Sequence, residues 1–130
     1  MSYQHAVVWV DHQHATVIDY TVDDRHVVEI EREGGQRQVH RRSGAPGSGK
    51  APIDHVFFGE IAAALEGVRE ILIVGPGSAK FELQSELQAR HPVVAKAIVG
   101  VESADHPSTG QLLAFAKKYF KRIDALLGDA

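Results

Sequence analysis

The sequence contains no cysteine and no long apolar run, and it has only one methionine and one tryptophan. Without cysteine there is no disulfide and no thiolate metal site, which fits a reducing compartment. No apolar run approaches the roughly 20 residues that a membrane-spanning helix needs. The first residues, MSYQHAVVWVDHQH, lack the basic start and the cleavage site of a signal peptide. We therefore expect a cytoplasmic protein with no membrane partner.

The chain has 130 residues, of which 44% are hydrophobic. This length and composition are typical of one globular domain with its own core. No internal repeat divides the sequence. We expect a single domain over residues 1–130, carrying a flexible basic loop at about residues 33–53.

Charge is distributed unevenly along the chain. The net charge is −3, but residues 32–50 contain five basic residues and one acidic residue, so this segment carries +4 and the rest carries −7. The basic residues are Arg32, Arg37, Arg41, Arg42 and Lys50. A basic segment on an acidic body indicates either a polyanionic partner or a solvated loop, and charge alone favours neither.

Apolar and β-branched runs predict three consecutive antiparallel strands over residues 5–10, 15–22 and 26–32. A polar stretch, QRQVHRR at residues 36–42, has the pattern of a short edge strand. The following residues, SGAPGSGKAP, are rich in glycine and proline and predict an exposed, mobile loop. Unbroken apolar runs, EILIV and AIVGV, predict two further strands over residues 70–74 and 97–101.

Three helices are predicted, the first after the N-cap Asp54, the second after the N-cap Ser78 and the third over residues 109–127. Their apolar positions have helical spacing. These positions are Phe57, Phe58, Ile61, Ala62 and Leu65 in the first helix, Phe81, Leu83 and Leu87 in the second, and Leu112, Leu113, Ala116, Phe120, Ile123 and Leu127 in the third. The order β-β-β-α-β-α-β-α predicts an α/β fold with three α/β/α layers and a mixed sheet of about five strands, the ribonuclease-H-like arrangement.

Residues 44–50, GAPGSGK, match the phosphate-loop pattern G-x-x-x-x-G-K. However, Ala51 replaces the Ser or Thr whose hydroxyl holds Mg²⁺, and Pro52 disfavours a helix that starts at Lys50. The preceding residues are basic and polar, unlike a buried strand. Nucleotide binding by this loop is therefore only an alternative hypothesis, and we expect no cofactor.

Three other motifs are candidates for a site. Gly34-Gly35-Gln36 is explained by a hairpin turn, because glycine accepts a positive φ without strain. The cluster Asp11, His12 and His14 has the pattern of an exposed turn, and we assign no metal site to it. A turn that joins a buried strand to a helix could bind an anion through its amides or could simply require small residues. Its residues are Gly75, Gly77, Ser78 and Lys80.

The segments AVVWVDHQHATVIDY, HVVEIE, ILIVGPGSAK and AIVGVESADHPSTGQLLAFAKKYF, with the loop up to GSGK between them, resemble one family. It is the middle domain of the archaeal and eukaryotic class-1 peptide-release factors and of Pelota. VGPGSAK and the pair Gly110-Gln111 are the closest matches. The chain is most similar to the stand-alone bacterial proteins called "translational machinery protein". The resemblance implies a ribonuclease-H-like fold and a ribosome, rRNA or tRNA partner.

In the release factors, a Gly-Gly-Gln tripeptide just before the first helix hydrolyses peptidyl-tRNA. Here Gly47-Ser48-Gly49-Lys50 holds that position, and Gln36 lies well upstream. Lys50 cannot replace a Gln amide, which both donates and accepts hydrogen bonds. The leading hypothesis is therefore a ribosome- or RNA-binding module without release catalysis. We expect it to bind no DNA, and a homodimer is a further possibility. Its phosphate contacts would be Arg37, Arg41, Arg42 and Lys50, with Gly47 and Gly49 allowing close approach. The enzyme alternative is a minimal peptidyl-tRNA hydrolase that uses Gln36.

Overall fold

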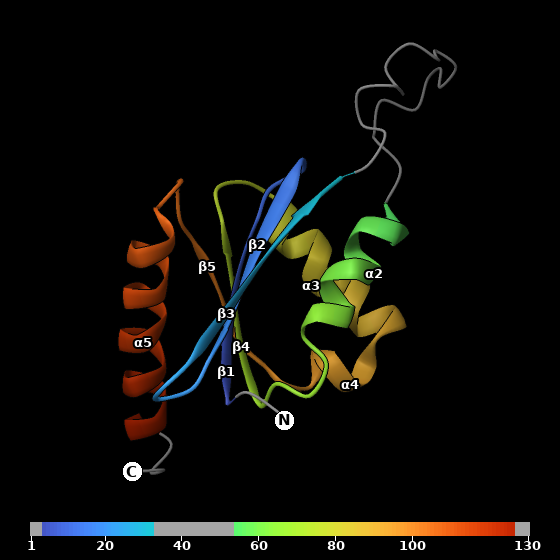
Figure 1. Cartoon of the computed structure of the whole chain (residues 1–130). Coiled ribbons are helices and arrows are strands. Elements are labelled where there is room, and N and C mark those ends of the chain that lie inside the picture. The colour runs from blue at the N-terminus through green and yellow to red at the C-terminus, as the bar shows by residue number, and fades with distance from the viewer. Residues whose placement is uncertain (1–3, 33–53, 127–130) are drawn as a thin grey trace, which may run out of the picture.

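The computed structural model describes residues 4–32 and 54–126 (Figure 1). These residues form five strands and four helices in the order β-β-β-α-β-α-α-β-α. The strands are β1 (His5–Val10), β2 (His14–Tyr20), β3 (Arg25–Glu31), β4 (Glu70–Gly75) and β5 (Ile98–Ser103). The helices are α2 (His55–Ala64), α3 (Ala79–Arg90), α4 (Pro92–Ala95) and α5 (Thr109–Leu126).

The strands form one mixed sheet in the order β3-β2-β1-β4-β5. Strand β2 is antiparallel to both β1 and β3, whereas β1 pairs parallel with β4 and β4 pairs parallel with β5. The predicted α/β class and the mixed five-stranded sheet are confirmed. The ribonuclease-H-like name for this arrangement stays a prediction.

Helices cover both faces of the sheet, with α5 alone on one face and α2, α3 and α4 on the other (Figure 1). Alternate residues of β1 therefore enter two cores. Ala6, Val8 and Val10 pack in the core with the buried residues of α2 and α3, and Val7 and Trp9 pack in the core with those of α5. This arrangement explains why HAVVWV is apolar at consecutive positions.

The structure differs from the sequence prediction in several places. Strand β2 ends at Tyr20, and Val22, which was predicted to continue it, is exposed. The prediction that Phe81 packs inward is wrong, because its side chain is 53% exposed. The buried stripe of α3 contains Leu83 and Leu87, and a residue two positions before Leu83 projects from another side of the helix. Helix α4 was not predicted, since its four residues are too few for a periodic pattern.

None of the helices within residues 4–32 and 54–126 combines the length and hydropathy that crossing a bilayer requires. Helix α5 has 18 residues, but its exposed face carries Lys117, Lys118, Lys121 and Arg122. Among the side chains of this helix whose burial is described, the buried apolar ones face the sheet: Leu112, Leu113, Ala116 and Phe120.

Candidate functional site at the carboxyl edge of the sheet

Strands β1, β4 and β5 are parallel, so their carboxyl ends meet at one edge of the sheet. The same edge holds the turn between β1 and β2 and the amino ends of α2, α3 and α5 (Figure 1). In open α/β sheets, ligands bind outside the carboxyl ends of the strands. We call this region the loop edge, because Arg32 and Asp54, the two residues that flank segment 33–53, lie there.

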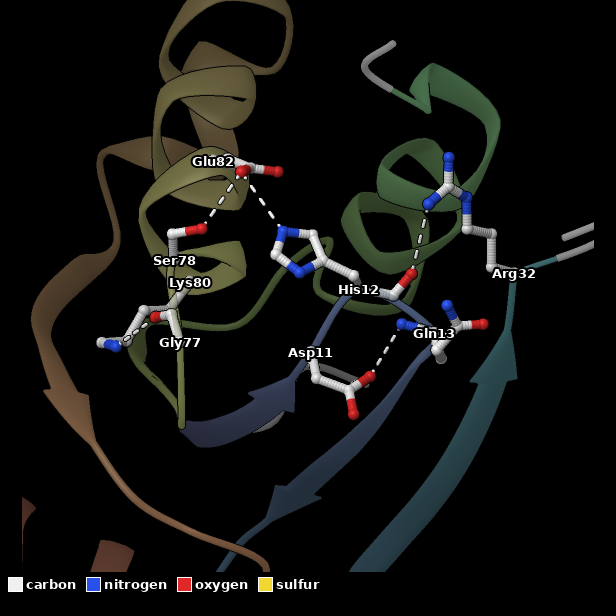
Figure 2. Close-up of polar contacts among 8 residues, drawn as sticks. All are labelled: Asp11, His12, Gln13, Arg32, Gly77, Ser78, Lys80 and Glu82. Atoms are coloured by element: carbon white, nitrogen blue, oxygen red, sulfur yellow. Dashed lines mark hydrogen bonds and ion pairs between the residues drawn. The ribbon is translucent and has the colours of Figure 1, made fainter. Parts of the chain in front are cut away.

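The two ends of segment 33–53 are joined at the loop edge. Arg32 Nε donates to Asp54 Oδ2 at 2.9 Å, although the two residues are 22 positions apart. The backbone N–H of Arg32 also donates to the carbonyl of Gln13 at 2.9 Å. Figure 2 shows a third contact, from Arg32 Nη1 to the carbonyl of His12 at 3.3 Å. Both ends of the segment are thus anchored to the β1–β2 turn and to helix α2.

The carboxylate of Asp54 has two partners. Its Oδ1 accepts the backbone N–H of Phe57 at 2.9 Å, which is an N-cap bond at the start of α2, and its Oδ2 accepts from Arg32. Capping satisfies one of the amides that a helix leaves unpaired at its amino end. The side chain that caps the helix therefore also joins the two residues that flank segment 33–53. The N-cap at Asp54 was predicted from the sequence, and it is confirmed.

Two substitutions of Asp54 separate the cap from the ion pair. Asp54→Ala removes both, and we expect the free energy of unfolding to fall by about 1–2 kcal/mol. Asp54→Asn keeps a good capping oxygen and loses only the charge, so we expect a loss of less than about 1 kcal/mol for this partly exposed pair. Urea unfolding followed by circular dichroism measures both values. Equal losses in the two variants would show that the cap contributes nothing.

Asp11 organises the turn between β1 and β2. Its Oδ1 accepts the backbone N–H groups of Gln13 and His14, each at 2.8 Å. Its own N–H donates to the carbonyl of His14 at 3.0 Å. An aspartate that bonds the backbone two and three residues ahead makes a tight turn, so the predicted turn is confirmed. Figure 2 shows His12 directed away from this turn, with Nε2 3.2 Å from Glu82 Oε2.

The four residues of the predicted anion turn lie where β4 joins α3, from the last residue of β4 to the second residue of α3, but they differ in their surroundings. A Cβ on Gly75 would lie 2.2 Å from the carbonyl oxygen of Val10, whereas a Cβ on Gly77 would meet no atom within 4 Å. The need for a small residue, the alternative to anion binding, therefore explains Gly75. It does not account for Gly77, at which the structure leaves room for a side chain.

Ser78 and Lys80 are both bonded within the turn. Ser78 is the N-cap residue of α3, but its hydroxyl donates to Glu82 Oε2 at 3.3 Å and makes no capping bond (Figure 2). The ammonium of Lys80, a buried residue, donates to the carbonyl of Gly77. The carboxylate of Glu82 lies in the first turn of α3, where the helix dipole favours a negative charge. An anion at this turn would have Glu82 beside it, and anion binding here stays a prediction.

Trp9 is a residue of the loop edge that sequence reasoning missed. Its indole Nε1 donates to the carbonyl of Asp105, and its ring packs against those of His14 and His106, at centroid distances of 5.0 and 4.9 Å. These contacts attach the loop after β5 to the end of β1. The sequence signal was the position of the only tryptophan of the chain, at the end of a central strand.

Gln111, part of the Gly110-Gln111 match, has a structural partner at the start of α5. Its Oε1 accepts the N–H of Ser108 at 2.9 Å, and its own N–H donates to Ser108 Oγ at 3.1 Å. This reciprocal pair is a capping box. The other predicted site residues lie outside the described part of the chain: Gln36, Arg37, Arg41, Arg42, Gly47, Gly49 and Lys50.

No protein-family model matches the chain. The chain is 25% identical over 122 residues to the pelota homolog of Archaeoglobus fulgidus, an alignment that covers 92% of the chain and 35% of that protein. The crystal structure of A. fulgidus Pelota superposes with a TM-score of 0.59 at 19% identity, over 91% of this chain and 32% of Pelota. The chain thus spans about a third of the length of the relatives that it matches.

Two further solved structures have the same fold over part of their length. Dom34 of S. cerevisiae, a translation termination-like factor, matches with a TM-score of 0.55 at 13% identity, over 85% of this chain and 31% of Dom34. The archaeal translation termination factor aRF1 matches with a TM-score of 0.52 at 16% identity, over 95% of this chain and 39% of aRF1. The chain therefore shares its fold with these Pelota and release-factor structures, and the resemblance that its sequence predicted is confirmed.

Proposed function

We propose that this domain is a translation-associated module that binds the ribosome or its RNA through segment 33–53. The proposal rests on one observation above all, the ion pair between Arg32 and Asp54 that joins the two ends of this segment at the loop edge. A segment whose ends are fixed loses less conformational entropy when it binds than a free chain end does. We also propose that the protein acts in the cytoplasm, where ribosomes are found.

The charges of the segment favour an RNA partner. Since Arg32 is paired with Asp54, the basic residues left for an outside partner are Arg37, Arg41, Arg42 and Lys50, against the single acid Glu33. Arginine and lysine bind phosphate oxygens, and these contacts account for most of the sequence-independent affinity for nucleic acids. Gly47 and Gly49 have no side chain to keep an RNA backbone away from the segment.

The proposal does not include release catalysis or nucleotide binding. Lys50 stands where a release factor carries its Gln, and a lysine cannot accept a hydrogen bond. For a nucleotide, the helix that begins at the lysine of a phosphate loop has to present free amides to the phosphates. Helix α2 instead begins after Asp54, and the carboxylate of Asp54 already occupies its amino end.

The likeness to translation factors supports the class of partner only. Yeast Dom34 is described as a factor in RNA quality control pathways that interacts with Hbs1. This chain matches about a third of Dom34. We therefore limit the proposed partners to the ribosome, rRNA and tRNA, and we assign no protein partner.

Reversing charge within the segment tests the proposal. At low salt, we expect the parent protein to sediment with ribosomal particles and the double variant Arg41→Glu, Arg42→Glu to stay at the top of the gradient. Each phosphate contact contributes roughly 0.7 to the slope of log K against log salt on single strands, so the loss of two arginine contacts lowers the steepness of this slope by about 1.4. The matched control is Lys118→Glu with Arg122→Glu, which makes the same change in net charge on the exposed face of α5.

Three outcomes would contradict the proposal. If the parent protein never sedimented with ribosomes, the proposed ribosome association would be wrong. Equal loss of binding in the two double variants would show that net charge matters and the segment does not. Hydrolysis of peptidyl-tRNA by the parent that is lost in Gln36→Ala would replace the proposal with the enzyme alternative.

A further inference from the structure

A row of three polar side chains crosses the sheet at the edge opposite to the loop edge. The strand register pairs His5 of β1 with Tyr20 of β2 on one side and with Glu70 of β4 on the other. Directly paired residues point to the same face of a sheet. That face is the one covered by α5, because His5 lies on the same side of β1 as Val7 and Trp9, which pack against α5.

Helix α5 adds a second carboxylate to this row. Asp124 lies one helical turn after the buried Phe120. The ring centroid of Phe120 is 4.5 Å from that of His5. His5 Nε2 is 3.0 Å from Glu70 Oε1 and 3.9 Å from Asp124 Oδ2. The side chains of His5, Glu70 and Asp124 are only 18%, 17% and 31% exposed. One imidazole nitrogen and two carboxylates therefore meet in a largely buried place.

The ligand atoms of this cluster are in ion-pair contact, but they make no hydrogen bond. Within the described part of the chain, His5 Nε2, Glu70 Oε1 and Asp124 Oδ1 are buried and have no hydrogen-bond partner. One ligand atom from each of the three residues lies within 4.8 Å of the other two. Buried polar atoms are costly when they have no partner. Ion-pair contacts alone leave these atoms without a hydrogen bond, and atoms this close can serve as the ligands of one ion.

The hydroxyl of Tyr20 is a separate indication of a ligand. The residue is 5% exposed, and its hydroxyl has no hydrogen-bond partner among the described residues. Its ring stacks on that of His5, with the centroids 5.5 Å apart, and both residues line one groove with Asp124. Burial raises the pKa of this hydroxyl, and the negative charges of Glu70 and Asp124 raise the pKa further. A buried Tyr hydroxyl in this position can bond to a ligand or to an ion-bound water.

We propose that His5, Glu70 and Asp124 bind one divalent transition-metal ion, with Zn²⁺ as the best fit. Zinc is bound by imidazole nitrogen and carboxylate oxygen at about 2.0–2.2 Å, with four ligands in a tetrahedron. Such a tetrahedron places neighbouring ligand atoms roughly 3.3 Å apart. The observed separations of 3.0 and 3.9 Å lie on either side of this value. Three protein ligands leave a fourth position for water, in the groove that Tyr20 also lines.

The charge of the cluster also suits a divalent cation. With a neutral imidazole, Glu70 and Asp124 supply two negative charges, which one Zn²⁺ balances. Two lysines, Lys117 and Lys121, line the same groove, and the ammonium of Lys117 is 5.9 Å from the centre of the Tyr20 ring. Both lysines are exposed, so water screens their repulsion of the ion.

The ion would hold together three elements that are far apart in the sequence. It would join the first residue of β1, the first residue of β4 and the last turn of α5. It would lie across the sheet from Arg32 and Asp54, so metal binding and RNA binding are independent. We therefore expect the metal to stabilise the fold and to leave ribosome association unchanged.

Equilibrium dialysis of the untagged full-length protein, after removal of metal with EDTA, tests the proposal. We expect one Zn²⁺ per chain, not displaced by an excess of Mg²⁺, which prefers oxygen ligands. Co²⁺ serves as a visible probe, because its absorption reports a four-coordinate site. His5→Gln and Asp124→Asn change the side chains little in size but remove a metal ligand. We expect each to weaken Zn²⁺ binding by more than about tenfold, the smallest effect usual for residues that only support a ligand. Tyr20→Phe should weaken it by about 10- to 100-fold.

The eight histidines of the chain require a matched control. His12 lies 3.2 Å from Glu82 at the opposite edge of the sheet, in a pair that is about half exposed, and His12→Gln should leave the Zn²⁺ stoichiometry unchanged. Circular dichroism of each variant verifies that it is folded. Failure of the parent to bind Zn²⁺, or undiminished binding in both folded variants His5→Gln and Asp124→Asn, would overturn the proposal.

Discussion

Replacing Gly75 with alanine is expected to lower the free energy of unfolding by about 3 kcal/mol, at the upper end of the usual cost of overpacking. The added Cβ would lie 2.2 Å from the carbonyl oxygen of Val10. This oxygen belongs to the backbone of the central strand β1, so no side chain can rotate to make room. Strand β4 cannot retreat either, because Gly75 also accepts a hydrogen bond from the N–H of Ala104.

Gly77→Ala is the matched control, two residues along the same turn. A Cβ there would have no atom within 4 Å, and Gly77 does not have a positive φ. We expect a change within about 0.5 kcal/mol, as for other unstrained surface positions. Urea unfolding of the two variants and the parent measures the difference. Equal stability of the two variants would mean that β1 and β4 separate without cost.

Phe120→Ala is expected to destabilise the domain by about 3–5 kcal/mol, the range for loss of a buried Phe ring. Phe120 is 2% exposed and lies in the core between α5 and the sheet. Its ring packs against those of His5 and Tyr119, the latter edge-on with centroids 5.9 Å apart. On this face α5 is the only helix that covers the sheet within the described residues (Figure 1), so no neighbouring helix can fill the cavity.

Phe81→Ala removes the same ring from α3 and serves as the control. The Phe81 side chain is about half exposed, and its ring contacts the ammonium of Lys80, which lies 4.8 Å from the ring centre. We expect a loss of at most about 1 kcal/mol, the value of an exposed cation–π contact. A loss as large as that of Phe120→Ala would show that Phe81 is buried in solution, as the sequence pattern predicted.

Much of the fold could be predicted from local patterns. Strand β4 is apolar at consecutive positions because both of its faces are covered, and Asp54 has the side chain that an N-cap needs. The exposure of Phe81 could not be predicted, since apolar spacing does not show which side of a short helix faces the core. Helix α4 had one signal, Pro92 at its first position, but four residues are too few for a pattern.

The two candidate sites differ in what their sequence could reveal. The basic residues and the Asp54 cap were visible in the sequence, but the pairing of Arg32 with Asp54 depends on folding. The proposed metal ligands were not visible, because His5, Glu70 and Asp124 have no common spacing. A short turn fixes the pairing of β1 with β2, and hence of His5 with Tyr20, whereas no turn connects β1 to its parallel neighbour β4.

The contact between His5 and Asp124 has a consequence for engineering the chain. Because the first strand starts where the last helix ends, a short peptide could link these two elements. A linked chain could then be reopened within segment 33–53, whose flanking residues are already held together by Arg32 and Asp54. Such a circular permutant would retain every strand pair of the sheet. It would divide the basic segment between two new chain ends, so that folding and ribosome association could be measured separately.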